Sequence, residues 1–227
     1  MTKTVRNFLA LSFLLTASMP ALAETVSTGE AKPSLKITVR VYDYAQVRPR
    51  TLVGAKREAG KILRKAGVEV VWLDCYGATI EENPACRQSL GPSDLVLRIV
   101  RPNRAARAAL RHNTCGLSVL PKNGGGGTYA TIFYDGLEEV AKALRLPRKL
   151  ILGHTAAHEI GHLLLASTGH SRSGLIRAVF CPNDWDRAGR GDLLFTPGQG
   201  QRVRAGVMER LRQQEQAVQM AQLVPAN

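Results

Sequence analysis

The stretch HEIGHLLLASTGH, residues 158–170, decides how this chain is to be interpreted. His158 and His162 are four residues apart, and in an α-helix such residues lie about 40° apart around the axis and about one turn apart along it. Both imidazoles can therefore reach a single metal ion. The sequence predicts a helix here that carries two metal-ligating histidines.

Two further residues of this stretch complete a candidate hydrolytic zinc centre. Zinc in such centres takes three protein ligands and leaves one position open for water. His170 lies beyond the predicted helix and is our third ligand. Glu159 directly follows the first histidine, where its carboxylate can take a proton from the attacking water as a general base.

The residues around the motif predict that this helix is buried. Apolar residues precede His158, and Leu163, Leu164 and Leu165 follow His162. Gly161 costs about 1 kcal/mol of helix propensity, so we expect another part of the chain to pack closely against it.

From His158 to Ile176 the chain reads HEIGHLLLASTGHSRSGLI, which resembles the zinc peptidases called metzincins, especially their matrixin-like bacterial members. Their pattern is HExxHxxGxxH, followed by a turn that holds a methionine beneath the metal. The resemblance implies that His158, His162 and His170 bind zinc and that Glu159 is the general base.

The chain departs from that pattern at two places. Seven residues instead of five separate His162 from His170, and Leu165 occupies the glycine position, so we expect the helix to end near residues 167–169 with Gly169 in a left-handed turn. The turn after His170 holds Leu175 and Ile176 and no methionine. Ile176 can replace the methionine if that residue serves as an apolar floor.

An acidic third ligand is the alternative to His170, because other HExxH families complete the site with an aspartate or a glutamate. Asp184 and Asp186 lie in the appropriate downstream region. A charged pair in a loop is more often simply solvated.

The patterning of the rest of the chain predicts an α/β (α+β) fold. Alternating or continuous apolar residues predict strands over 34–44, 68–73, 95–100, 116–120 and 129–134, with an amphipathic helix over 50–65. A C-terminal helix is predicted over about 197–223, with Thr196 as its N-cap, and residues 181–192 are predicted to be a loop.

This order of elements also resembles metzincin catalytic domains. The resemblance implies a five-stranded mixed twisted sheet with an antiparallel edge strand, here residues 116–120, to which an extended peptide substrate adds as a further strand. We expect a single catalytic domain over residues 34–227, and the glycines at 124–127 are predicted to be a connector.

The N-terminus predicts export. Lys3 and Arg6 precede an apolar run over 8–17, and residues 21–23 read ALA, which is typical of a cleaved signal peptide. The apolar run is shorter than the roughly 20 residues that span a bilayer. We therefore predict cleavage after Ala23, a flexible tail over 24–33 and a secreted or periplasmic product without a transmembrane segment.

Export permits disulfides, and the chain holds four cysteines. Three pairings are possible. We favour Cys75 with Cys86, which closes a short polar loop, and Cys115 with Cys181.

The formal net charge of +13 predicts attraction to anionic partners, such as a cell-envelope polymer, although such a basic face can also serve solubility alone. Nucleic acid is disfavoured, because only 5% of residues are aromatic and no nucleic-acid-binding motif is present. We expect a monomer that acts on peptide or protein substrates.

The sequence thus favours an exported zinc metalloendopeptidase. Two alternatives stay open: a non-catalytic zinc-containing binding module of the same fold, and an amidase of peptidoglycan that uses the same ligands and base on a different amide.

Overall fold

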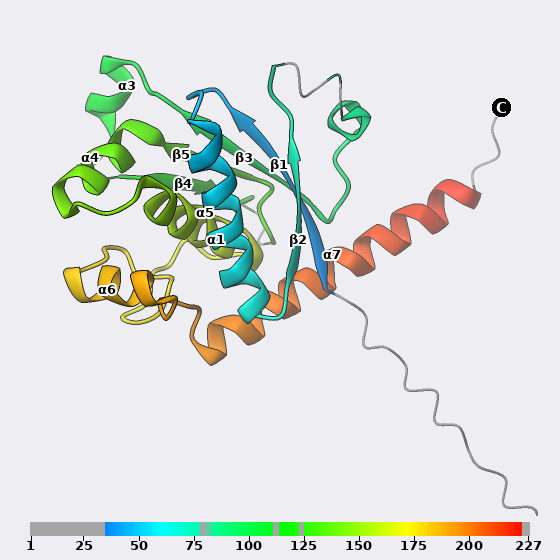
Figure 1. The fold of residues 1–227 in the computed structure, drawn as a ribbon. Coiled ribbons are helices and arrows are strands. Elements are labelled where there is room, and N and C mark those ends of the chain that lie inside the picture. Colours follow the sequence, from blue (N-terminus) through cyan, green and yellow to red (C-terminus); the bar gives the residue numbers. More distant parts are fainter. Residues whose placement is uncertain (1–34, 78–80, 82, 111–113, 123–124, 224–227) are drawn as a thin grey trace, which may run out of the picture. The chain divides into compact units, whose positions relative to one another are not determined.

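Five strands form one mixed sheet in the order β2-β1-β3-β5-β4 (Figure 1). The strands are β1 (Lys36–Asp43), β2 (Glu69–Asp74), β3 (Asp94–Val100), β4 (Gly116–Val119) and β5 (Tyr129–Phe133). Neighbouring strands are parallel except for β4, which pairs antiparallel with β5 at the edge, with Gly116 opposite Ile132. The predicted fold class, including the antiparallel edge strand, is confirmed.

The computed structural model describes residues 35–77, 81, 83–110, 114–122 and 125–223. The expected signal peptide at 1–23 and tail at 24–33 lie outside these residues, as does Gly124 in the glycine run. In the described ranges, no helix combines the length and the apolar character needed to cross a membrane.

In the described ranges, six α-helices of several residues and one short 3-10 helix accompany the sheet. They are α1 (Pro49–Lys65), the 3-10 helix η1 (Pro84–Arg87), α3 (Arg104–Ala109), α4 (Tyr134–Leu144), α5 (Arg148–Leu165), α6 (Pro182–Arg190) and α7 (Pro197–Leu223). Helix α1, the motif-bearing helix α5 and the C-terminal helix α7 were all predicted. The remaining short helices were not.

The core lies between one face of the sheet and the helices α1 and α5, which pack along each other (Figure 1). Paired residues that point toward this core from neighbouring strands are fully buried, for example Val39 opposite Leu95 and Val41 opposite Leu97. Small residues on the helices, including Ala55, let the two elements approach closely. The other sheet face is more open, since Leu117 and Val119 of β4 are more than half exposed.

Helix α6 replaces the loop that we predicted at residues 181–192. Pro182 occupies the first turn, the Asp184 carboxylate accepts the N–H of Cys181 at 3.0 Å, and Gly191 ends the helix in a left-handed conformation. Pro, acid and glycine at these positions are the expected signals of a short helix. The prediction was wrong because the polar composition outweighed these boundary signals.

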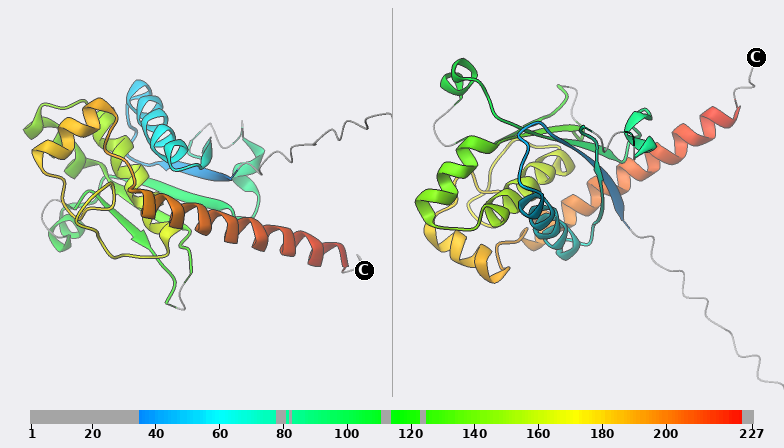
Figure 2. Two further views of the ribbon diagram at one scale, coloured as in Figure 1. Left: turned by 90° about the horizontal axis from the view of Figure 1, so that it is seen from below. Right: turned by 45° about the horizontal axis from the view of Figure 1, so that its top comes forward.

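Helix α7 begins at Pro197, and Thr196 is its N-cap, as predicted. The Thr196 hydroxyl accepts the N–H of Gln199 at 3.2 Å, and the Gln199 side chain accepts the N–H of Thr196 at 2.9 Å. The first half of the helix packs on α5 through Val203 and Val207. Its far half is mostly exposed and extends away from the sheet in both views of Figure 2.

Only one of the two favoured disulfides is present among the described residues. Cys75 is bonded to Cys86 with Cα atoms 5.5 Å apart, as predicted. The predicted bond between Cys115 and Cys181 was wrong, because both are free. Cys115 is placed by β4, next to β5, whereas the Cys181 thiol lies 3.1 Å from Oδ2 of Asp184 at the start of α6.

Candidate metal centre

Helix α5 brings His158 and His162 together one turn apart, as the four-residue spacing predicts. Both side chains are buried, and their Nε2 atoms lie 3.0 Å apart. The helix is almost entirely buried from Ile151 to Leu164, so its backbone cannot shift without disturbing the core. The two imidazoles therefore hold a fixed separation.

Each of these imidazoles is oriented by a backbone carbonyl. Nδ1 of His158 lies 2.7 Å from the carbonyl oxygen of Leu175, and Nδ1 of His162 lies 2.6 Å from that of Ser167. A carbonyl can only accept, so both Nδ1 atoms donate and, in the neutral rings, both Nε2 atoms carry a lone pair. Such contacts orient histidines that bind metals.

Two lone pairs that face each other at 3.0 Å require a proton or a cation between them. Burial, together with the neighbouring histidines, lowers the pKa of His158 to about 4, and burial and His170 also lower the pKa of His162. A shared proton is therefore disfavoured at neutral pH. The geometry favours a metal cation instead.

His170 joins this pair from outside the helix. Its ring centroid lies 5.4 Å from that of His158 and 4.9 Å from that of His162, and its side chain is exposed. The helix ends earlier than expected, because Ala166 and not Gly169 adopts the left-handed conformation, with φ of 49°. The predicted position of the turn was wrong, but the chain still returns the third histidine to the other two.

The three histidines form a cluster that can bind a zinc ion. One nitrogen from each ring lies within 4.8 Å of the other two. Zn–N bonds of about 2.0–2.1 Å in a tetrahedral site place ligand nitrogens about 3.3 Å apart, so small side-chain rotations bring this set to the required spacing. Imidazole nitrogen is also a ligand that zinc prefers.

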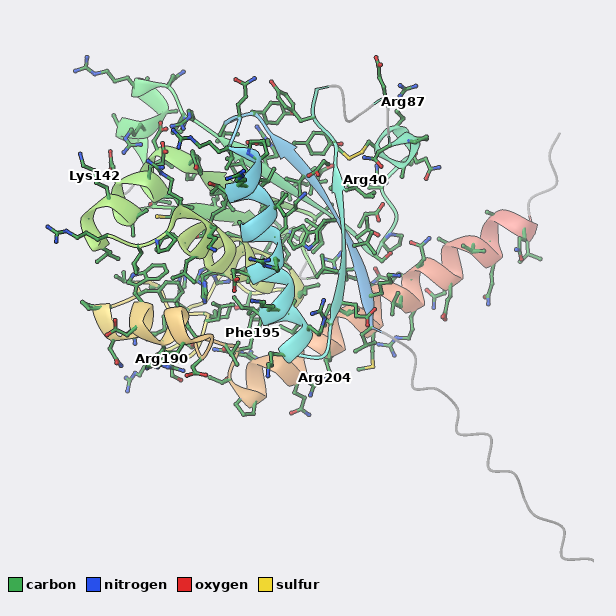
Figure 3. The ribbon with its side chains drawn as sticks, in the orientation of Figure 1. Arg40, Arg87, Lys142, Arg190, Phe195 and Arg204 are labelled. Carbon is green, nitrogen blue, oxygen red and sulfur yellow. A yellow bond between two sulfur atoms is a disulfide. The ribbon has the colours of Figure 1, made fainter. Side chains whose placement is uncertain are left out.

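The turn over residues 171–176 lies against the helix beside these histidines. Leu175 and Ile176 are fully buried, and Leu175 provides the carbonyl that accepts from His158. A Cβ on Gly161 would lie 2.8 Å from Ile176 and 2.7 Å from Phe195, which is labelled in Figure 3. The expected close packing at Gly161 is present, and the side chains of Phe195 and Ile176 provide it.

Glu159 points toward the edge strand β4. Its Oε2 atom lies 2.5 Å from the Ser118 hydroxyl oxygen, and its side chain fills the space next to Gly116, where a Cβ would come 2.3 Å from Oε1. Burial raises the pKa of Glu159 and outweighs the opposing hydrogen bond from Ser118, so that the pKa is about 7. A carboxyl group with this pKa can take up and release a proton near neutral pH.

The acidic alternatives for the third ligand are not part of the histidine cluster. Asp184 is buried, and its Oδ2 atom pairs with Arg177 at 2.9 Å. Burial raises the pKa of Asp184, but the contacts with Cys181 and Arg177 outweigh it, so that the pKa is lowered. Asp186 is exposed on the same helix. Neither carboxylate belongs to the set of potential ligands formed by His158, His162 and His170.

Two residues near the site were not predicted from the sequence. Ser118 could have been found from strand alternation, because the predicted strand at 116–120 places residues 116 and 118 on the same face. Arg210 could not, since its guanidinium reaches back from α7 to the carbonyl oxygens of Gly127 and Leu163. It connects the loop before β5 to the end of α5.

No protein-family model matches the chain, and no curated protein matches it. Among solved structures, it is similar to a zinc-dependent peptidase from Methanocorpusculum labreanum, with 15% sequence identity and a TM-score of 0.46. The match covers 73% of this chain and 99% of the other. A likeness of this degree carries no conclusion about this chain's activity.

Proposed function

We propose that this protein is an exported, matrixin-like zinc endopeptidase in which His158, His162 and His170 hold the metal and Glu159 is the general base. The proposal rests chiefly on one observation: the Nε2 atoms of two buried histidines face each other at 3.0 Å with both Nδ1 atoms already engaged. The signal peptide over 1–23 and the single catalytic domain over 34–227 are part of it.

Zinc in such a site would polarise the scissile carbonyl and make a water molecule more acidic. Glu159 would take the proton of the attacking water and pass it to the leaving amine. Its pKa of about 7 suits both transfers, because neither protonation state is strongly favoured near neutral pH. Ser118 donates to this carboxylate and holds it toward β4.

The position of strand β4 at the edge of the sheet is an argument for a peptide substrate. The strand pairs with β5 alone among the described strands. An extended peptide could add along it through main-chain hydrogen bonds, which do not depend on side-chain identity. Because Gly116 and Ser118 of the same strand touch Glu159, a peptide bound there would lie close to the base.

The proposal is tested by measuring zinc content and cleavage of a quenched fluorescent peptide library. We expect one zinc per chain and cleavage that falls roughly 10²–10⁴-fold in Glu159→Gln, a change that keeps the shape of the side chain and removes the base. The variant should keep its zinc. Cleavage that survives in Glu159→Gln would exclude Glu159 as the base.

The basic surface favours a second candidate, hydrolysis of amides in an anionic cell-envelope polymer. Five cationic side chains border one face of the α1–α5–α6 region. Purified peptidoglycan should be assayed beside the peptide library with the same two proteins. Glu159-dependent release of stem peptides without peptide cleavage would replace the endopeptidase by an amidase, and zinc binding without either activity would indicate a binding module.

A further inference from the structure

A cavity separate from the histidine cluster opens between α1, the first half of α5 and α6. It has a volume of about 640 Å³, and none of the three clustered histidines lines it. Small-molecule sites typically have volumes of about 300–1,000 Å³. The cavity therefore has the size of a site for a small ligand.

The walls of this cavity are largely apolar. They come from all three helices and the segments that precede α5 and α7. The apolar lining residues are Ile62, Leu146, Pro147, Leu150, Ala188 and Leu194. Such a lining would accommodate an aliphatic chain, whose transfer from water is favourable by about 0.8 kcal/mol per buried CH₂ group.

The rim is strongly cationic. Five exposed basic residues line it: Lys61, Arg64, Lys65, Lys149 and Arg190. Glu58 is the single acidic residue among the lining residues. Lys61 pairs with Glu58 at 3.2 Å, and Arg190, labelled in Figure 3, pairs with Asp192 at 3.7 Å. Within the described part of the chain, the other three have no acidic partner within 4.0 Å.

A buried histidine in the wall has one ring nitrogen that is not hydrogen-bonded by any described residue. His154 is only 2% exposed and lines the cavity, and its Nδ1 lies 3.0 Å from the carbonyl oxygen of Leu150. Its Nε2 has no hydrogen-bond partner in the described part of the chain. Buried polar groups are nearly always paired, so an unpaired one calls for water or a ligand that completes its surroundings.

We propose that this cavity binds a small anionic amphiphile, with its aliphatic chain between α1, α5 and α6 and its carboxylate or phosphate head at the cationic rim. The apolar walls and the excess of unpaired cations together select this chemistry over a neutral or cationic ligand. The site is independent of the proposed peptidase function, since it shares no residue with the zinc centre.

Isothermal titration calorimetry with ten-carbon ligands below their micellar concentrations tests the proposal. Decanoate and decyl phosphate should each bind once per chain, whereas decanol should bind at least tenfold more weakly and decyltrimethylammonium should not bind. Acetate and inorganic phosphate should not bind measurably, because they lack the chain. Equal affinity for decanol and decanoate, or no binding of either anion, would overturn the proposal.

Two double variants locate the binding. Arg64→Gln with Lys65→Gln removes two unpaired rim charges and should lower the affinity for decanoate at least tenfold. Arg87→Gln with Arg104→Gln removes two exposed charges from η1 and α3, which do not line the cavity, and should leave affinity unchanged. Thermal melting without ligand verifies that both fold. Equal weakening in the two variants would show attraction by net charge and overturn the site.

A fluorescence measurement gives a readout next to the cavity, through a tryptophan that contacts His154 in its wall. The rings of Trp185 and His154 are 6.3 Å apart, edge to face, and Trp72 is the other tryptophan of the chain. In a Trp72→Phe background, decanoate should change the Trp185 emission with the midpoint found by calorimetry. Binding without any change at Trp185 would place the ligand elsewhere and contradict the proposal.

Discussion

The hydroxyl oxygen of Ser118 in the edge strand lies 2.5 Å from Oε2 of Glu159 in the metal-site helix. Both residues are buried. The hydroxyl donates to the ionised carboxylate and so favours the charged form, against the burial that raises the pKa of Glu159. The contact connects the strand proposed to bind substrate with the proposed base.

Ser118→Ala should therefore move the acidic limb of the pH profile. Without the hydroxyl, the pKa of Glu159 rises further, and since the base must be ionised, the acidic limb of kcat/KM shifts to higher pH. We expect zinc content to be unchanged and stability to fall by about 1.5–3 kcal/mol, because a buried carboxylate loses its donor. An unchanged pH profile with normal zinc content would separate Ser118 from the base.

Gly116→Ala should impair activity through the position of Glu159. The new Cβ would lie 2.3 Å from Oε1, so the carboxylate must move. Activity should fall at least tenfold while zinc stays bound. Gly198→Ala is the matched control, because a Cβ there meets nothing within 4 Å. Equal activity in the two variants would mean that the carboxylate has other productive positions.

Zinc content distinguishes the two ligand schemes. His170→Ala removes one of three clustered imidazoles and should lower the zinc that survives dialysis against a weak chelator. Asp184→Asn should retain zinc but lose stability, because it weakens the buried pair with Arg177. Zinc lost from Asp184→Asn and kept in His170→Ala would reverse the assignment.

The turn beneath the histidines tests whether an apolar floor is sufficient. Ile176→Met keeps the side-chain volume near Gly161 and should leave zinc content and activity within about threefold of the original chain, at a cost below about 1.5 kcal/mol. Ile176→Ala leaves a cavity there and should cost about 2–5 kcal/mol in urea unfolding. A large gain of activity in Ile176→Met would instead assign a role to the thioether.

Periodicity in the sequence was enough to predict all five strands and α1, because each carries a clear apolar pattern in register with its secondary structure. Helix α5 was predicted from the spacing of its histidines and their apolar neighbours, and α7 from Thr196 as its N-cap. The pairing of His158 with His162 followed from helix geometry alone. The contacts of Ser118 with Glu159 and of Arg210 with Gly127 depend on tertiary packing over 41 and 83 residues of separation, which no local pattern encodes. The exit of α5 at Ala166 was missed because glycine is the usual left-handed residue.

The two free cysteines give a test that does not depend on catalysis. Burial, with a smaller contribution from the nearby Glu159 and Glu139, raises the pKa of the Cys115 thiol to about 11. Since the thiolate is the reactive form, Cys115 in a Cys181→Ser variant should react very slowly with a soluble maleimide at pH 8 and rapidly in denaturant.

The same shift has a consequence for stability. The folded pKa lies above the ordinary value of 9.0, so the protonated thiol favours the folded state, and this contribution is complete below about pH 9 and is lost as pH rises through about 11. Replacing Cys115 by Ala in the same Cys181→Ser background should remove that part of the alkaline loss, as measured by urea unfolding at pH 8, 9 and 10. Rapid labelling of native Cys115 at pH 8, or an identical alkaline slope in the two variants, would show that this side of β4 opens readily to solvent.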